Sequence, residues 1–405
     1  MQKVTFLKAG VGAAAVVALG LAVAAPARAD IAPTATDVVG VGSDTVQYVA
    51  DFLDDGFTTA TGLVGGYNTF NKNRVFSFDA TADASGHTSY PANGSAGGSL
   101  STTIVVRQGQ KPVTRPNGSG AGISRLLADS NHTLDFVRSS RLPKGAEQTD
   151  SRAVAFGGLH VYQIATDGLQ LATVPNSNVP AGLTAADIYK IYSGGAKKWS
   201  DLAGCKNGAY VCPAPDDGIV PITPQSGSGT RNDFFGDLAA KVAGAQNLAN
   251  GGLGSNVVVG EEHDPTAIVN VAGGNGQTAT DTNGNTITNK DALSPFSTGR
   301  YNLIQSGYFG ASLVNSVELL PASATNSANY FLQRFLYVIV RQSDVTQTTK
   351  LFQPGGTQNF VQALFAATNL AGAPTSWYGK SSNSALFTAA GVTQAWADKG
   401  LASSS

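Results

Sequence analysis

Charged side chains are scarce in this chain. Only 13% of its 405 residues are Asp, Glu, Lys or Arg, divided into 26 basic and 27 acidic residues. Such a chain lacks the net positive charge of nucleic-acid-binding proteins and the high net charge typical of disordered proteins. We therefore expect no nucleic acid as a partner, and any site for an anion must be built locally.

The usual enzyme motifs are also absent. The sequence has no G-x-S-x-G elbow, no H-E-x-x-H pair and no G-x-x-x-x-G-K-[ST] loop. Its four histidines, His87, His132, His160 and His263, stand apart from one another. We predict a protein that is not an enzyme, with no cofactor and no metal. The run Glu261–Asp264 could hold a cation, but we interpret it as an exposed loop.

Cysteine is limited to two residues, Cys205 and Cys212. A zinc site would need two further ligands, and no histidine lies close to this pair in the sequence. In an exported protein two cysteines at this spacing close a local loop. The prediction is a disulfide between them.

The first 29 residues have the pattern of a signal peptide. Lys3 and Lys8 precede an apolar run of small residues from Ala9 to Ala25, and Ala27-Arg28-Ala29 offers a cleavage site before Asp30. The run is weakly hydrophobic, whereas a membrane anchor needs about 20 strongly apolar residues. No cysteine follows it for lipid attachment. We expect a secreted protein, cleaved after Ala29, without a lipid anchor.

Removal of the leader leaves a chain long enough for two domains of about 150 residues. Strands and helices are mixed without an internal repeat, which favours an α/β fold. The spacing of apolar residues predicts helices over residues 45–60 and 384–397. The apolar run over residues 331–341 predicts a buried strand. Residues 80–103 and 273–291, rich in small and polar residues, are expected to be surface insertions.

Three Gly/Ser/Thr turns, each followed by a helix-like segment, are the most informative feature. They are Gly40–Thr45, Gly118–Gly122 and Ser226–Thr230. Glycine allows a tight turn and close approach to a ligand, and Ser and Thr cap helices. The N-terminus of a helix attracts anions. One such turn is an ordinary cap or loop, but three suggest a small oxyanion held between several helix N-termini.

The order of the motifs resembles the phosphate-binding proteins of bacterial ABC transporters, which have the type 2 periplasmic-binding-protein fold. That family runs GxGAT, GSSGG, DFGASD, GKIKKWDD and RxDGSGT. The corresponding stretches here, in the same order, are Gly40–Thr45, Gly118–Gly122, Asp135–Ser140, Gly194–Asp201 and Gly227–Thr230. Arg334–Val340 is also similar to the penultimate strand of the family.

The resemblance implies a two-lobed α/β protein with a hinge and a cleft between the lobes. We expect lobe 1 at residues 30–158 and 303–405, and lobe 2 at residues 159–302. Crossings near Leu159–Ala165 and Ser294–Tyr301 would act as hinges. The implied function is binding of phosphate or a related small oxyanion for uptake through an ABC transporter permease, and we expect a monomer.

The resemblance also implies a set of ligand-binding residues, because the family encloses its anion with hydroxyls and backbone N–H groups of these turns. Carried over to this chain, they are Ser43, Asp44, Thr45, Ser119, Ser139, Ser140, Ser228, Gly229, Thr230 and Arg231. Arg138, Arg141 and Arg115 are further candidates for positive charge near the anion.

The chain departs from the family at charged positions. The family's Asp in GASD, which accepts a proton from the phosphate, falls at Ser140, and its Arg before DGSGT falls at Pro224. Asp44 stands where the family has a neutral Thr, so it either restores the acceptor or caps a helix. Phosphate, sulfate and a larger organic ligand all stay open. The alternative function is an extracellular structural or adhesive protein that reuses the fold without transport, and a filled cleft would favour it.

Overall fold

The structure, a computed structural model, describes residues 32–59, 62–80, 103–272, 290–320, 331–347 and 359–402. Within these ranges one mixed sheet of ten strands dominates, in the order β10-β9-β11-β8-β13-β7-β1-β4, with β12 and β14 also paired to β8. Its strands are β1 (Val38–Gly42), β4 (Val75–Ser77), β7 (Phe136–Ser139), β8 (Leu159–Thr173), β9 (Gly218–Pro224), β10 (Val258–Gly260), β11 (Lys290–Ser297), β12 (Glu318–Leu319), β13 (Phe331–Arg341) and β14 (Thr393–Leu401).

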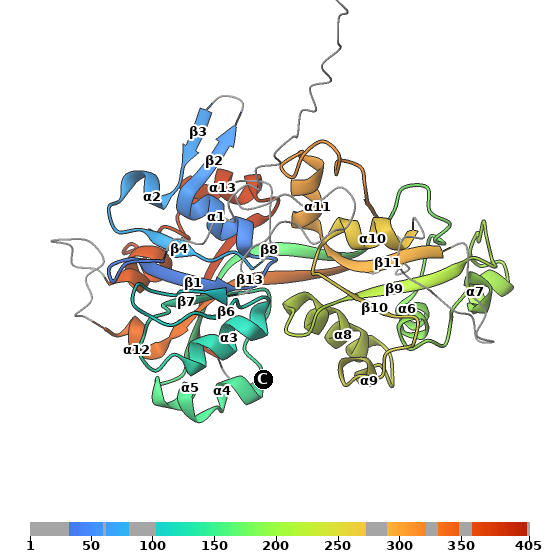
Figure 1. Ribbon diagram of the computed structural model, residues 1–405, viewed down its shortest axis with the longest axis horizontal. Helices are drawn as coiled ribbons and strands as arrows, with labels where there is room; N and C mark the ends of the chain where they lie inside the picture. The colour runs from blue at the N-terminus through green and yellow to red at the C-terminus, as the bar shows by residue number, and fades with distance from the viewer. Residues whose placement is uncertain are drawn as a thin grey trace, which may run out of the picture.

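The sheet runs along the long axis of the molecule, and the two longest strands join its two halves (Figure 1). β1, β4 and β7 lie in one half, while β9, β10 and β11 lie in the other. β8 pairs with β13 from Leu159 to Gln170, and its later residues pair with β11. The α/β prediction is confirmed. The lobe boundaries and the two hinge segments stay predictions.

Alternating side chains of β1 explain the two layers of helices in the first half. Val38 packs in the same core cluster as Phe52 of α1, whereas Val39 and Val41 pack with Ile123 of α3. Successive residues of a strand point to opposite faces, so each face receives its own helices. The elements around this half are α1 (Gln47–Asp55), β2 (Gly56–Thr59), β3 (Gly62–Gly65), α2 (Tyr67–Phe70), β5 (Thr103–Ile104), β6 (Val113–Thr114), α3 (Ser119–Ala128), α4 (Gly145–Gln148), α5 (Ser151–Ala155), α12 (Gln342–Val345), η2 (Gln362–Ala366), η3 (Ser381–Asn383) and α13 (Ser384–Ala389).

The second half has a core of aromatic and aliphatic side chains between β9 and its helices. Tyr192, Phe234 and Phe235 are fully buried there, and their rings meet edge to face or tilted. The helices of this half are α6 (Ala185–Tyr192), η1 (Trp199–Asp201), α7 (Ala203–Lys206), α8 (Gly229–Lys241), α9 (Gln246–Ala249) and α10 (Pro265–Ala272), and α11 (Thr298–Gln305) follows β11.

Two helix predictions extend too far. The helix expected over 45–60 ends at Asp55, because Gly56 has φ = 91° and starts the hairpin strand β2. The helix expected over 384–397 ends at Ala389, and Gly391 (φ = 81°) turns the chain into β14, which pairs with β8. Pairing with a central strand overrides helical spacing here. Most of the expected surface insertions, residues 81–102 and 273–289, lie outside the described residues.

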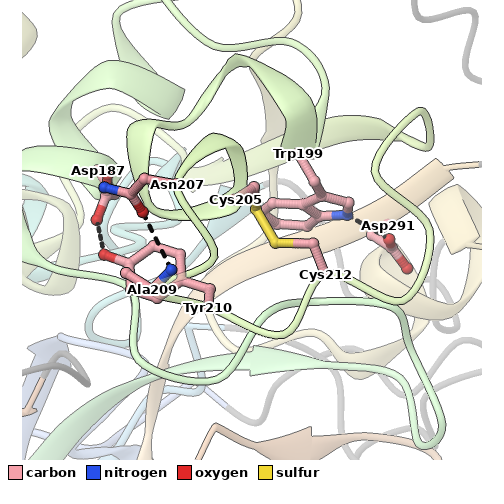
Figure 2. The surroundings of a disulfide bond; sticks show 8 residues. All are labelled: Asp187, Trp199, Cys205, Asn207, Ala209, Tyr210, Cys212 and Asp291. Atoms are coloured by element: carbon pink, nitrogen blue, oxygen red, sulfur yellow. Dashed lines mark hydrogen bonds between the residues drawn. A yellow bond between two sulfur atoms is a disulfide. The ribbon is translucent and has the colours of Figure 1, made fainter.

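The predicted disulfide between Cys205 and Cys212 is confirmed, with their Cα atoms 5.8 Å apart (Figure 2). Beside it, the indole N–H of Trp199 donates a hydrogen bond to Asp291 at 2.7 Å. The hydroxyl of Tyr210 donates to Asp187 at 2.5 Å. These contacts hold the loop near α7, at the outer end of the second half (Figure 1).

Candidate functional site

The three Gly/Ser/Thr turns meet in the structure. The N–H of Gly118 donates to the carbonyl of Gly42 at 3.3 Å, and the N–H of Gly120 donates to the carbonyl of Gly227 at 3.1 Å. Gly118 has φ = 99°, and a Cβ there would collide with the backbone of Gly227. The sequence therefore needs glycine at this point, because only its bare backbone lets the second and third turns touch.

Each turn leads into a helix, so three helix N-termini face the same region. α1 starts at Gln47, α3 starts at Ser119, and α8 starts at Gly229. Ser228 caps α8, because its Oγ accepts a hydrogen bond from the N–H of Arg231 at 3.0 Å. Helix N-termini carry unsatisfied N–H groups and a partial positive charge.

Two serines of the predicted set meet at the start of α3. The hydroxyl oxygens of Ser119 and Ser140 are 3.3 Å apart, and the N–H of Ser140 donates to Ser119 Oγ at 3.0 Å. Gly229 lies against both, since a Cβ on it would clash with the two hydroxyl oxygens. The second and third turns therefore present hydroxyls and backbone at the same place.

A buried group of polar side chains joins the first and third turns. The hydroxyls of Thr45 and Thr230 both donate to Oε1 of Glu262, at 2.7 and 2.5 Å. His263 Nε2 lies 3.1 and 3.0 Å from the same two hydroxyls. The N–H of Ser297 donates to His263 Nδ1, so the ring hydrogen resides on Nε2. With Arg334, these four residues (Thr45, Thr230, Glu262 and His263) form what we call the central cluster.

Glu262 is the negative charge of the central cluster. Burial alone would raise the pKa of its carboxyl, but the hydrogen bond from His263 and those from the hydroxyls of Thr230 and Thr45 hold that pKa below its ordinary value. The carboxylate is therefore ionised although none of it is exposed. Its other oxygen, Oε2, is buried without a hydrogen-bond partner.

Arg334, near the start of β13, brings positive charge to the central cluster. Its Nη1 donates to Thr230 Oγ1 at 2.7 Å, while Nε and Nη2 both donate to Asp167 Oδ2 at 3.0 and 2.8 Å. Burial opposes the charge, but Asp167, Asp233 and Glu262 raise the pKa of the guanidinium. The cation is thus held by β8 and β13, the strands shared by both halves.

Two more carboxyl groups near the cluster hold protons at unusually high pH. Burial raises the pKa of Asp233 to about 7, against the charges of Arg334 and Arg141. Burial, with the nearby carboxylates of Asp44 and Glu262, raises the pKa of Glu261 to about 8, although Asn117 donates to it at 2.8 Å. Raised acid pKa values are frequent at functional sites.

Asp44 pairs with a cation on the other side of the first turn. Arg300 Nη2 donates to its carboxylate at 2.9 Å and to its carbonyl at 3.1 Å, and the guanidinium lies 4.4 Å from the ring centroid of Tyr48. Both charged side chains are buried.

Several predicted residues do not reach the central cluster with their side chains. The guanidinium of Arg231 donates to the carbonyl of Pro224 at 3.0 Å and lies over the ring of Phe235. Arg138 donates to the carbonyls of Phe78 and Ser43 beneath the first turn. Arg115 donates to the carbonyl of Asp79, and Arg141 pairs with Glu147. The hydroxyl of Ser139 donates to the carbonyl of Arg141. The buried hydroxyl of Ser43 has no hydrogen-bond partner.

Glu262, His263 and Arg334 were not among the predicted ligand-binding residues. The interpretation of Glu261–Asp264 as an exposed loop is wrong, because Glu262 and His263 are 0% and 1% exposed. The sequence offers one signal, a short apolar run directly before Gly260, which in the structure is part of β10 and pairs in parallel with β9, the strand that precedes the third turn. The carboxyl ends of parallel neighbours lie at one edge of a sheet. Arg334 also had a signal in the sequence, because a basic residue within a strand predicted to be buried indicates a charged group held inside the fold.

None of the helices in the described ranges combines the length and apolar character needed to cross a membrane. Among those same residues, no three His, Cys, Asp or Glu side chains are grouped so that they could hold a metal ion.

Curated relatives match a limited part of the chain. A phosphate-binding protein PstS of Staphylococcus epidermidis is 32% identical over 120 residues, which is 29% of this chain and 32% of that protein. The PstS of Staphylococcus haemolyticus is 30% identical over 120 residues, 29% of this chain and 33% of its own. The chain thus spans about a third of the length of the curated relatives it matches.

Solved structures of similar proteins align over most of the chain at low identity. An ABC-type phosphate transport receptor from Vibrio cholerae is 16% identical, with 88% of this chain and 99% of that chain covered and a TM-score of 0.43. A phosphate binding protein from Stenotrophomonas maltophilia is 12% identical, with 89% and 91% covered and a TM-score of 0.46.

The family model covers far more of the chain than the curated relatives do. The model described as the PBP superfamily domain matches residues 104–367, well over half of the sequence, and includes the second and third turns and Arg334. The resemblance seen in the sequence is confirmed by this match together with the α/β sheet and the meeting of the turns. The chain belongs to the PBP superfamily, the superfamily of the periplasmic binding proteins.

Proposed function

We propose that this protein is an exported solute-binding protein that binds phosphate or a related small oxyanion for uptake through an ABC-type permease. The substrate assignment draws on the curated relatives, which are named phosphate-binding proteins. Export draws on the signal-peptide pattern of residues 1–29, which lie outside the described residues. We propose binding and release without catalysis, by a monomer that takes no nucleic acid.

The meeting of the three turns is the observation that carries this proposal. Gly118 and Gly120 contact the first and third turns, and the hydroxyls of Thr45 and Thr230 approach within 3.3 Å. An oxyanion needs several convergent donors, and hydroxyls at helix N-termini supply them without a large net charge. Arg334 adds a fixed cation beside Thr230. We infer that the ligand binds where Ser119, Gly229 and Thr230 come together.

The proposed site lies between segments that we assign to two lobes. Thr45 and Ser119 belong to the first part of the chain, and Thr230 and Glu262 belong to residues 159–302. A ligand between them would draw the lobes together by rotation at the crossing segments. We propose the boundaries 30–158 with 303–405 for lobe 1 and 159–302 for lobe 2.

Calorimetry on the full exported chain tests the proposal. We expect binding of phosphate or sulfate, weakened by Ser119→Ala, because a hydrogen bond to a charged ligand contributes about 1.5–3 kcal/mol. Ser384→Ala, at an exposed position of α13, is the control and should bind as the wild type does. A wild-type protein that binds no oxyanion would remove the proposal, and the structural or adhesive function would then lead.

A further inference from the structure

A cavity of about 630 Å³ opens beside α2 and the β2–β3 hairpin, in the first half of the molecule (Figure 1). One wall comes from the end of β3 and from α2, and most of the other wall comes from residues 375–386. None of its lining residues belongs to the three turns or to the central cluster. Small-molecule sites are clefts of about 300–1,000 Å³. The cavity therefore offers room for a small ligand at a second place on this chain.

Three aromatic rings form the apolar wall of this cavity. Trp377 lies edge to face with Tyr67, with ring centroids 5.4 Å apart, and is tilted against Phe70 at 6.2 Å. The indole N–H of Trp377 donates to the carbonyl of Leu53 at 2.7 Å, which fixes the ring. Phe70 is 68% exposed, although burial of its ring would be favourable. A flat ring in the cavity would pack against these side chains and cover Phe70.

The cavity also holds a positive charge. Of the described residues that line it, Lys380 alone is charged. Its Nζ lies 3.8 Å from the centroid of the Trp377 ring, and this cation–π contact holds the ammonium group in place. Burial lowers the pKa of Lys380, and no acidic side chain of the described residues opposes this shift. The ammonium group therefore has hydrogen-bond donors to offer to an anionic ligand.

The amide side chains of the cavity already serve the fold. Asn71 Nδ2 donates to the carbonyl of Tyr67 at 2.8 Å, and Asn383 Nδ2 donates to the carbonyl of Trp377 at 2.7 Å. A sugar carries hydroxyls on all sides, and each of them needs a partner when it is buried. Three rings with a single cation suit instead a ligand that has one anionic group on an apolar ring.

We propose that this cavity binds a small organic acid that carries a carboxylate on an aromatic ring. Lys380 receives the carboxylate, and the rings of Phe70 and Trp377 receive the ring of the ligand. An ammonium group binds a carboxylate through a charge-assisted hydrogen bond, and aromatic rings attract one another edge to face or offset. The site is separate from the oxyanion site, so the inference does not rest on the proposed function.

Titration of the full exported chain with benzoate, followed by ligand-observed NMR at neutral pH, tests this inference. Benzamide is the neutral probe of nearly the same shape. The wild-type chain should bind benzoate at millimolar concentration and benzamide about tenfold more weakly, because a hydrogen bond between charged groups is stronger than a neutral one. Added phosphate should leave the affinity for benzoate unchanged, since the cavity shares no residue with the three turns.

Variants of the lining residues locate the bound benzoate. Lys380→Gln should lower the affinity for benzoate about tenfold and change that for benzamide little. Phe70→Ala should weaken the binding of both probes. Lys190→Gln on α6 and Leu370→Ala replace exposed side chains outside the cavity, so these controls should bind both probes as the wild type does. If a thermal melt shows that Lys380→Gln is unfolded, Phe70→Ala decides, because its ring is exposed.

Three outcomes would overturn the inference. A wild-type chain that binds no benzoate at millimolar concentration lacks the site. Equal affinity for benzoate and benzamide would remove the role of Lys380. Wild-type affinity in Phe70→Ala, or displacement of benzoate by phosphate, would place the benzoate elsewhere. A chain that binds no oxyanion loses the proposed function alone, because the benzoate titrations still decide this inference.

Discussion

The hydroxyl oxygens of Thr45 and Thr230 lie 3.3 Å apart, although 185 residues separate them in the chain. One precedes α1 and the other lies in the first turn of α8, so the contact joins the N-terminal regions of two helices from different halves. The same two hydroxyls hold Glu262. We therefore expect a substitution at either threonine to change the affinity for the ligand more than it changes the packing of distant parts of the fold.

Replacing Thr230 by Val should weaken oxyanion binding by about tenfold or more. The substitution keeps the shape of the side chain but removes the hydroxyl that we place against the ligand beside Arg334, and a hydrogen bond to a charged ligand contributes about 1.5–3 kcal/mol. Titration calorimetry measures the change. Thr388→Val, on the exposed side of α13, is the matched control. Unchanged affinity in Thr230→Val would place the ligand elsewhere.

Replacing Arg334 by Met should destabilise the protein by about 3–5 kcal/mol, because it leaves Asp167 as a buried charge without its guanidinium. Urea unfolding followed by circular dichroism gives the free energy of unfolding. The comparison is Arg152→Met, which breaks a solvent-screened pair with Asp150 and should lower the free energy of unfolding far less. Equal losses in the two variants would contradict the importance of the buried pair.

Stability should fall as pH rises from about 4.5 towards 8. The pKa of Glu261 is raised to about 8 in the folded protein, so between its ordinary value and 8 the folded state holds a proton that the unfolded state has released. Asp233, with its pKa raised to about 7, acts in the same direction up to about pH 7. Glu262 acts in the opposite sense, since its lowered pKa stabilises the fold above its ordinary value and that contribution is lost on acidification.

The Glu261→Gln variant isolates one of these groups. It should reduce the decline in the free energy of unfolding between pH 5 and 8, by at most about 1.4 kcal/mol per pH unit. Urea unfolding at each pH measures the slope, and Glu318→Gln should leave it unchanged. A Glu261→Gln slope equal to that of the wild type would mean that Glu261 is ionised throughout this range.

Loss of the disulfide should lower stability without abolishing ligand binding. The double variant Cys205→Ser with Cys212→Ser opens a short loop, which costs on the order of 2–3 kcal/mol at most. The loop lies at the outer end of the second half, away from the three turns (Figure 1). Thermal melts and calorimetry measure the two effects, and mass spectrometry of the secreted protein should find no free thiols. Loss of oxyanion affinity in the variant would contradict this separation.

The sequence could predict the turns because their chemistry is local. A glycine such as Gly118 and a capping residue such as Ser228 act on their own neighbours, so their roles follow from adjacent residues. The order of the motifs then indicated the family and its α/β fold. The same local reasoning gave the disulfide, because its two cysteines lie in one short loop.

The charged residues of the site could not be predicted in this way. Arg231 directly follows the third turn, yet its guanidinium bonds Pro224, while Arg334 reaches Thr230 from a distant strand. Which side chain reaches a site depends on the packing of strands far apart in sequence. Glu262 was missed for the same reason, because its polar neighbours are typical of an exposed loop, whereas its contacts with Thr45 and Thr230 come from turns far away in the sequence.

The long ladder between β8 and β13 connects the two halves of the sheet. These two strands stay hydrogen-bonded to each other across both halves, with one register irregularity between Leu336 and Tyr337. A ribbon of this kind resists stretching through its hydrogen bonds but yields to torsion, and a bulge increases its local twist. If one half rotates against the other, as we propose, we expect the twist to concentrate at this irregularity, which lies close to Arg334 along β13.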